Sequence, residues 1–90
     1  MMENDTIKVY GTIWCGDCFR AKRLLNHHKI EFEWINIDLD RDGKDFVRQV
    51  NHGSTVVPTI IFADGTILSE PSNTELLSKL GIINEEKSGR

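Results

Sequence analysis

Two cysteines separated by two residues constrain this chain more than any other feature. Cys15 and Cys18 are the only cysteines among its 90 residues. They stand where a short apolar run, 7–10, gives way to a segment in which Cys18, Ala21 and Leu25 recur with helical spacing. We therefore expect Cys15 at the N-terminus of a helix and Cys18 one turn inside it.

The start of a helix is a position at which a cysteine gains reactivity. Unpaired backbone N–H groups and the positive end of the helix dipole stabilise an anion there, and the thiolate is the nucleophilic form of cysteine. We therefore expect Cys15 to be the catalytic nucleophile and Cys18, on the core side of the helix, to be the resolving cysteine. Gly16 and Asp17 should modulate the pair. The carboxylate of Asp17 opposes a neighbouring thiolate, and its alternative role is that of an ordinary acid in the first helical turn.

Composition limits the chain to a few classes of protein. We expect one domain over residues 1–90, with its core at about 7–81 and tails at 1–5 and 84–90. The net charge is −3 and no basic run is present, which argues against a nucleic-acid partner. Because we recognise neither a signal peptide nor an apolar run of membrane-spanning length, we expect a cytoplasmic protein with no membrane partner. Close cysteines in that compartment are more often catalytic or metal-binding than structural.

The apolar pattern predicts four strands and three helices in the order βαβαββα. Strands are predicted at 7–10, 31–37, 59–62 and from 67, and helices at 15–28, 42–51 and 72–81. The second strand is apolar on both faces, with Phe32 and Trp34 on one and Ile35 on the other, which is typical of a sheet covered by helices on both sides. Gly53 and Gly81 are predicted to end the second and third helices in the left-handed conformation.

Two motifs, joined by this order of elements, point to a known family. Trp14-Cys15-Gly16-x-Cys18 opens the first helix, and Val57-Pro58-Thr59 opens the third strand. Together they resemble the thioredoxin fold in its minimal glutaredoxin form, from about residue 7 to residue 81. Further motifs resemble the mycoredoxins and related bacterial glutaredoxin-like proteins: Asn51-x-Gly53, Phe62-Ala63-Asp64-Gly65 and Pro71-Ser72. The resemblance implies an α/β fold with a four-stranded mixed sheet and helices on both faces.

The resemblance also implies a binding site around the first sulfur. It implies a cis peptide bond between Val57 and Pro58 that faces the cysteines and leaves the backbone of Val57 free to pair with an extended substrate. We expect Trp14 to shield one side of the site and to contact the substrate, with core packing as the alternative. Further residues are expected at the rim of the site: Tyr10, Thr12, Arg20, Ser72 and Asn73.

Three of the rim residues are assigned to substrate binding, and each has a simpler alternative. Arg20 can attract a carboxylate of a small thiol, or it can be a solvated charge on the outer face of its helix. Ser72 and Asn73 can offer backbone N–H groups to a polar or anionic thiol at a helix start, or they can form a plain helix cap.

The function implied by the resemblance is that of a glutaredoxin- or mycoredoxin-like thiol–disulfide oxidoreductase in electron transport and cell redox homeostasis. Its substrates would be protein disulfides or mixed disulfides with a low-molecular-weight thiol such as mycothiol or glutathione, and a reductase or small thiol would recycle it. No bound cofactor is needed, and a monomer is expected. Glutathione-using glutaredoxins carry Cys-Pro-Tyr-Cys and a Gly-Gly at the third helix. Gly16-Asp17 and Pro71-Ser72-Asn73 stand there in this chain, which argues against glutathione.

An iron–sulfur cluster carrier of the monothiol-glutaredoxin type is the main alternative. A cluster needs four ligands, so one chain could not hold it through Cys15 alone. No dedicated metal site is expected. Asp38, Asp40 and Asp42 copy the start of a calcium loop, but its twelfth position is Gln49 instead of a bidentate Glu. A turn followed by a helix cap explains these acids.

Overall fold

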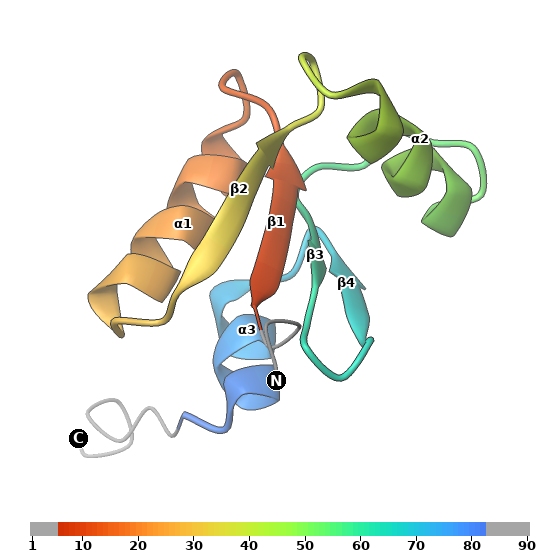
Figure 1. The fold of residues 1–90 in the computed structure, drawn as a ribbon. Helices are drawn as coiled ribbons and strands as arrows, with labels where there is room; N and C mark the ends of the chain where they lie inside the picture. Colours follow the sequence, from red (N-terminus) through yellow and green to blue (C-terminus); the bar gives the residue numbers. More distant parts are fainter. Residues whose placement is uncertain (1–5, 83–90) are drawn as a thin grey trace.

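The computed structural model describes residues 6–82 of the chain (Figure 1). Its elements are β1 (Ile7–Gly11), α1 (Gly16–His27), β2 (Phe32–Asn36), α2 (Arg41–Val50), β3 (Thr59–Ile61), β4 (Ile67–Ser69) and α3 (Asn73–Leu80). The predicted order βαβαββα is confirmed. Among these helices of residues 6–82, none has the length and apolar character needed to cross a membrane.

The four strands form one mixed sheet in the order β2-β1-β3-β4. Strand β1 is parallel to β2 and antiparallel to β3, and β3 is antiparallel to β4. Val9 marks the centre of the sheet, because it lies opposite Trp34 on β2 and Ile60 on β3. The parallel strands β1 and β2 end at the same edge of the sheet, so the loops that follow them, 12–15 and 37–40, lie at that edge (Figure 1).

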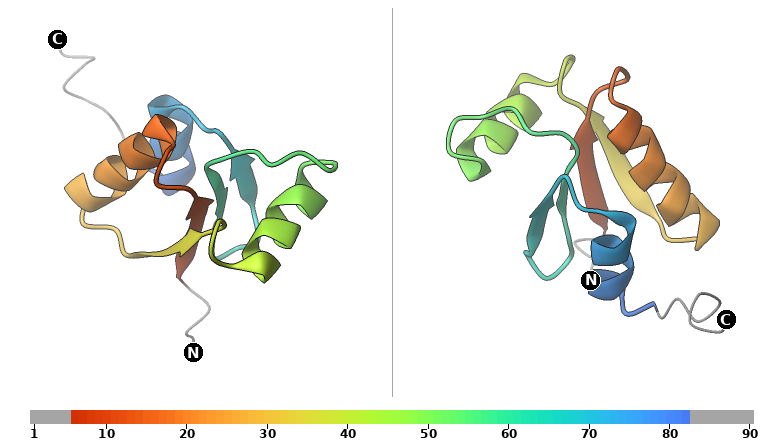
Figure 2. Two further views of the ribbon diagram at one scale, coloured as in Figure 1. Left: turned by 90° about the horizontal axis from the view of Figure 1, so that it is seen from above. Right: turned by 180° about the vertical axis from the view of Figure 1, so that it is seen from behind.

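Helices cover both faces of the sheet, as predicted from the second strand (Figure 2). On one face, α1 and α3 pack on the strands. Their side chains Ala21, Leu25 and Leu76 are fully buried against Val9 and Ile60. This layer anchors α1, and with it both cysteines, to the central strand of the sheet.

The other face is covered by α2, which buries Val47 against Tyr10 and Ile37. The Tyr10 ring is 8 % exposed and lies 4.9 Å from the ring of Phe46, centroid to centroid. Burial, and then the charges of nearby carboxylates, raise the pKa of Tyr10. The expectation that Tyr10 lies at the rim of the site is therefore wrong. Successive side chains of a strand alternate between faces, and Tyr10 points away from the face that α1 covers.

Helix α3 begins and ends at defined caps. Oγ of Ser72 accepts a hydrogen bond from the N–H of Glu75 at 3.1 Å, and Oε1 of Glu75 accepts one from the N–H of Ser72 at 2.7 Å. This reciprocal pair is a capping box. At the other end Gly81 has a φ of +77°, and the N–H of Ile82 donates to the carbonyl of Leu77 at 2.9 Å. The predicted left-handed glycine at the end of this helix is confirmed.

The end of α2 differs from the prediction. The helix ends at Val50, and His52, with a φ of +58°, is the first residue in the left-handed conformation. Gly53 follows with a φ of +94°, and its N–H donates to the carbonyl of Arg48 at 2.7 Å. This is the hydrogen bond of a Schellman end, in which His52 occupies the position that glycine usually takes. Gly53 was predicted to be the left-handed residue of this motif, but it is the residue after it.

Candidate active site

Cys15 is the N-cap of α1. Its backbone is extended, and its Sγ accepts a hydrogen bond from the N–H of Cys18 at 3.1 Å. The sulfur thus takes the place of the side-chain oxygen that usually satisfies the first N–H groups of a helix. Cys15 is partly exposed. The sulfur therefore lies at the positive end of the dipole of α1 and is accessible from solvent.

Cys18 lies one turn further into α1 and is only 1 % exposed. Burial, followed by the hydrogen bond to Cys15, raises the pKa of the Cys18 thiol to about 12, against weaker opposing effects of the Thr12 backbone and Lys22. At neutral pH Cys18 is therefore a protonated thiol. The two sulfurs have different surroundings: Cys15 is partly exposed at the helix start, and Cys18 is buried. This asymmetry fits one attacking and one resolving cysteine.

Gly11, the last residue of β1, leaves the space that Cys18 occupies. A Cβ atom at Gly11 would overlap Sγ of Cys18 and would lie 2.8 Å from the ring of Trp34. Any larger residue would push the Cys18 sulfur or the Trp34 ring out of place. The predicted strand at 7–10 stops one residue short of Gly11, and this role was missed. The available signal was a glycine at the end of a buried strand, four residues before Cys15, because such a glycine often marks a close approach.

The segment before β3 lies against the Cys15 sulfur. The peptide bond between Val57 and Pro58 is cis, as the resemblance implies. The thiol of Cys15 donates to the carbonyl oxygen of Val57 at 3.7 Å. Pro58 is buried, and its carbonyl accepts from the N–H of Glu70 at 2.7 Å. Within residues 6–82 the N–H of Val57 has no acceptor, so an extended chain can pair with it beside the sulfur.

Asn51, at the end of α2, holds this segment in place. Its Nδ2 donates to the carbonyl of Val47 at 2.7 Å and to Oγ1 of Thr59 at 3.1 Å. Its Oδ1 accepts from the hydroxyl of Ser69 at 2.6 Å. The buried Thr59 hydroxyl in turn donates to the carbonyl of Val56 at 2.7 Å. The network joins α2, β3 and β4, and it fixes the loop that contacts the Cys15 sulfur.

Trp14 lies on the surface beside Cys15. Its side chain is 80 % exposed, and its Nε1 donates to Oδ2 of Asp38 at 3.0 Å. This bond joins the loop before α1 to the loop after β2. Core packing, the alternative interpretation of Trp14, is therefore wrong, and the indole ring is placed where a substrate can contact it.

The acidic run after β2 serves local structure. Asp38 accepts the indole hydrogen bond, and Asp40 is the N-cap of α2, with Oδ1 accepting from the N–H of Gly43 at 3.0 Å. This cap starts the helix at Arg41, one residue before the predicted Asp42. In the described part of the chain, no group of three or more His, Cys, Asp or Glu side chains could hold a metal ion.

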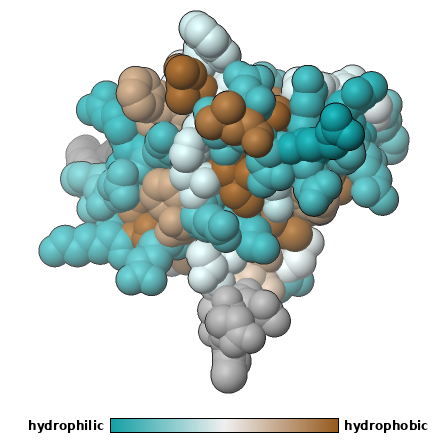
Figure 3. All heavy atoms as spheres, turned by 45° about the horizontal axis from the view of Figure 1, so that its top comes forward, coloured by the Kyte–Doolittle hydropathy of each residue, from teal (hydrophilic) through white to brown (hydrophobic). Residues whose placement is uncertain are grey.

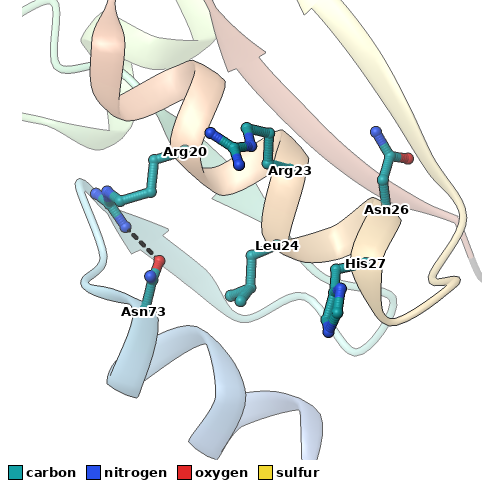
Figure 4. Close-up of a pocket in the computed structure, with 6 residues that line it drawn as sticks. All are labelled: Arg20, Arg23, Leu24, Asn26, His27 and Asn73. Atoms are coloured by element: carbon teal, nitrogen blue, oxygen red, sulfur yellow. Dashed lines mark hydrogen bonds between the residues drawn. The ribbon is translucent and has the colours of Figure 1, made fainter.

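Arg20 and Asn73 come together between α1 and α3 (Figure 4). Nη1 of Arg20 donates to Oδ1 of Asn73 at 2.7 Å and Nη2 donates to the carbonyl of Pro71 at 3.2 Å. Nη2 also lies 3.3 Å from the carboxylate of Asp17. Arg20 is thus engaged with the protein instead of being a free solvated charge. It ties the start of α3 to the first turn of α1. The N–H of Ser72 is likewise engaged, in the capping box, so Ser72 acts as a cap.

An open pocket of about 550 Å³ lies next to the contact between Arg20 and Asn73. It is lined by Arg20, Arg23, Leu24, Asn26, His27 and Asn73. Figure 4 shows that Arg20 and His27 extend on the side of α1 that faces α3, whereas Arg23 and Asn26 extend away from it. The cationic groups therefore do not converge on one point. Since neither cysteine lines this pocket, we place the candidate active site at the Cys15 sulfur.

Comparison with known proteins identifies the family of this chain. A family model described as Glutaredoxin matches residues 7–67. The matched region extends from β1 to the start of β4 and contains the dithiol and the Val57–Pro58 segment. The chain belongs to the glutaredoxin family. Its fold, with a four-stranded mixed sheet between α1 and α3 on one face and α2 on the other, is the thioredoxin-like fold of that family.

Named relatives share most of the length of this glutaredoxin. A Mycobacterium tuberculosis protein provisionally named a glutaredoxin is 40% identical over 74 residues, which cover 82% of this chain and 88% of that protein. Mycoredoxin 1 of Corynebacterium glutamicum is 31% identical over 74 residues, which cover 82% and 91%. The crystal structure of a mutant thioredoxin-like protein has a TM-score of 0.76 at 23% identity, covering 91% of this chain and 100% of that one. This last similarity concerns the fold alone.

Proposed function

We propose that this glutaredoxin is a dithiol oxidoreductase that reduces protein disulfides or mixed disulfides with a low-molecular-weight thiol. The observation that carries the proposal is the asymmetry of the two sulfurs. Cys15 is partly exposed at the helix start, where its Sγ accepts the N–H of Cys18, and Cys18 is buried one turn away. In this proposal Cys15 attacks, Cys18 resolves, and Trp14, Val57 and Pro58 contact the substrate.

The proposed reaction consists of two thiol–disulfide exchanges. The Cys15 thiolate attacks one sulfur of the substrate disulfide, and the other substrate sulfur leaves with the electron pair and takes up a proton. Cys18 then loses its proton and attacks Sγ of Cys15, which releases the second substrate sulfur as a thiol. The substrate has gained two electrons and two protons, and the protein holds a Cys15–Cys18 disulfide.

A high pKa suits the resolving role of Cys18. The hydrogen bond and the charge of Cys15 both contribute to the raised Cys18 pKa. Once Cys15 forms the mixed disulfide its sulfur carries no charge, so one of these causes is removed. Cys18 therefore becomes easier to deprotonate at the step in which it has to attack.

The reduced protein has to be regenerated by a second thiol or by a reductase. We propose a low-molecular-weight thiol, such as mycothiol or glutathione, as the co-substrate, and a monomer in the cytoplasm as the working form. The similarity to a protein named mycoredoxin supports a small-thiol co-substrate. The start of α3, with Pro71, Ser72 and Asn73, differs from the glycine pair of glutathione-using glutaredoxins. A direct comparison of the two thiols as reductants tests which one is used.

Trapping of the mixed disulfide tests the roles of the two cysteines. Cys18→Ser should stall the reaction after the first exchange and accumulate an adduct on Cys15, which intact mass measurement identifies. Cys15→Ser should form no adduct and lose disulfide reductase activity. The proposal is wrong if Cys15→Ser keeps full activity while Cys18→Ser loses it.

An iron–sulfur carrier is distinguished from the oxidoreductase by its colour and its subunit number. Because the described residues offer no group of three or more metal ligands, a four-ligand cluster would need a second chain or a bound thiol. Visible absorbance of the protein as isolated, together with a dimer in sedimentation, would support the carrier. A colourless monomer that reduces disulfides supports the oxidoreductase.

A further inference from the structure

The large hydrophobic side chains that are exposed in residues 6–82 all belong to the segments next to Cys15 and to the loop that is hydrogen-bonded to them. Ile13, Trp14, Phe19 and Leu39 are 71%, 80%, 66% and 85% exposed. Ile13 and Trp14 directly precede Cys15. Phe19 lies one helical turn after Cys15, and its N–H donates a hydrogen bond to the Cys15 carbonyl. The indole hydrogen bond described above brings the loop of Leu39 against this segment. We name these four side chains the apolar collar. Figure 3 shows hydrophobic residues gathered at this end of the molecule, with hydrophilic residues beside them.

The apolar collar lies outside the hydrophobic core of the described residues. None of its members belongs to either of the two core clusters of the described residues. Single exposed apolar side chains are common on proteins, but four of them around one reactive sulfur form a patch of the kind that marks a protein contact. Any molecule that brings a sulfur to Cys15 lies beside the collar. A protein segment on either side of a disulfide covers more of it than a small thiol does.

The charges next to the apolar collar are mainly negative. The loop after β2 and the start of α2 carry Asp38, Asp40 and Asp42 against one cation, Arg41, and all four are exposed. We name this run the acidic loop. On α1, the ammonium of Lys22 lies 3.8 Å from the ring centroid of Trp34 and 5.7 Å from that of Phe19, and Arg20 is paired with Asp17. A partner that approaches Cys15 over the acidic loop gains from carrying positive charge.

We propose that the apolar collar and the acidic loop form a docking surface for protein substrates whose disulfides are flanked by apolar and basic residues. The inference rests on the proposed function, because it names the substrate class for the same sulfur. The apolar flank of the substrate packs on Leu39, Phe19 and Ile13, and its basic residue lies over the acidic loop. The chemical step is the pair of exchanges already described, with two electrons passing from the dithiol to the substrate.

Four synthetic peptides separate the apolar requirement from the charge requirement. Each peptide holds one cysteine in a mixed disulfide with 5-thio-2-nitrobenzoate, flanked by leucine and lysine, leucine and glutamate, serine and lysine, or serine and glutamate. Fully reduced protein is mixed with each peptide, and release of the coloured thiol is followed in a single turnover. The leucine–lysine peptide should react about tenfold faster than the serine–glutamate peptide. Only the advantage conferred by lysine should shrink as salt is added.

Two matched pairs of variants place the effect on the proposed surface. Leu39→Ser should slow the leucine–lysine peptide about tenfold and the serine–glutamate peptide far less. Its control is Ala63→Ser, in the exposed turn between β3 and β4 at the opposite end of the sheet, which should change no rate. Asp42→Asn should reduce the preference for lysine, and Asp45→Asn, one turn further along α2, should not. Circular dichroism confirms that each variant is folded.

The outcomes separate this inference from the proposed function. If all four peptides release the coloured thiol at the same rate, in the protein and in the Leu39→Ser variant, the docking surface is refuted and the oxidoreductase stands. If no peptide releases it, the proposed function itself fails. If the protein sediments as a dimer that Leu39→Ser converts to a monomer, the apolar collar is an interface between two copies, and the inference is overturned.

Discussion

At the scale of single residues, the surroundings of two sulfurs define the candidate site. The helix start and the partial exposure of Cys15 were predictable, because apolar spacing in the sequence marks where a helix begins and which side is buried. The same spacing predicted that Cys18 faces the core. Glycine at the end of a buried strand signalled a close approach at Gly11, but local pattern could not name Trp34 as the neighbour, because Trp34 belongs to a different strand. Contacts of that kind appear only when strands are assembled.

Gly11→Ala tests the close approach behind the resolving sulfur. The added methyl group would overlap Sγ of Cys18 and press on the ring of Trp34, so we expect a loss of about 1–3 kcal/mol in the free energy of unfolding. Denaturant unfolding measures it. Gly16→Ala is the matched control, because a Cβ atom at Gly16 meets nothing within 4 Å. An equal loss in both variants would contradict the argument.

The pKa of Cys18 predicts how stability depends on alkaline pH. Burial raises it from 9.0 to about 12 in the folded protein, so the folded state retains a proton that the unfolded state gives up. The resulting stabilisation is present below about pH 9 and is lost as pH rises towards 12. Relative to Cys18→Ala, the reduced protein should lose on the order of 1 kcal/mol per pH unit in this window. Parallel stability curves for the two proteins would refute it.

At the scale of elements, local sequence signals predict some helix ends correctly and misplace others. Capping-box residues and the glycine after α3 lie where their local signals predict. The end of α2 was misplaced by one residue. Gly53 was expected to be the first left-handed residue after the helix, but His52 is. Hydrogen bonds between elements were also invisible to local pattern. Asn51 reaches Thr59 and Ser69 on two other elements, and no periodicity marks such a partner.

His52→Gly tests the unusual end of α2. A residue other than glycine at a φ of +58° carries a steric cost that glycine avoids. We expect the variant to gain about 0.5–1 kcal/mol in the free energy of unfolding. Gly53→Ala, with a φ of +94° at the next position, should have the opposite sign. Thermal unfolding of both variants measures the difference, and a destabilised His52→Gly would show that the imidazole has a contact of its own.

Asn51→Ala tests whether the network positions the loop that contacts the sulfur. The change removes three hydrogen bonds, to Val47, Thr59 and Ser69, and should cost about 1–3 kcal/mol of stability. It should also raise KM for a protein disulfide, since the segment beside Cys15 loses its anchor. Ser69→Ala removes only one of the bonds and serves as the milder control. A loss of stability with unchanged KM would limit the network to a structural role.

At the scale of the whole molecule, the mixed sheet determines where the chemistry takes place. The parallel pair β1 and β2 brings two loops to one edge, and the antiparallel return through β3 brings the Val57–Pro58 segment to the same edge. This arrangement follows from the order of elements, which was predicted from the sequence. The two apolar faces of β2 were predicted as well. Tyr10 was wrongly expected at the rim of the site: side chains alternate between the two faces of a strand, and Tyr10 lies on the face that α2 covers.

The contact between the β3–β4 turn and the last helix gives a prediction for acid stability. Lys79 of α3 donates to Asp64 at 2.6 Å and to Thr66 at 3.0 Å, and the Lys79 ammonium holds the pKa of Asp64 below its usual range. A depressed pKa stabilises the folded state above about pH 4 and loses that effect as pH falls. Asp64→Asn should therefore flatten the acid limb of the stability curve. An unchanged acid limb would show that solvent screens the pair completely.

The Cys15 sulfur, which is proposed to react, also accepts the hydrogen bond that caps the first turn of α1. Thiolate is a stronger acceptor than a sulfur locked into a disulfide, since charge strengthens a hydrogen bond. In the proposed reaction, each turnover therefore weakens and restores the hydrogen bond from the N–H of Cys18 to Sγ of Cys15. Disulfide exchange is thus linked to the stability of the first turn of α1. The rate of hydrogen exchange at the Cys18 amide should therefore report whether the protein is reduced or oxidised.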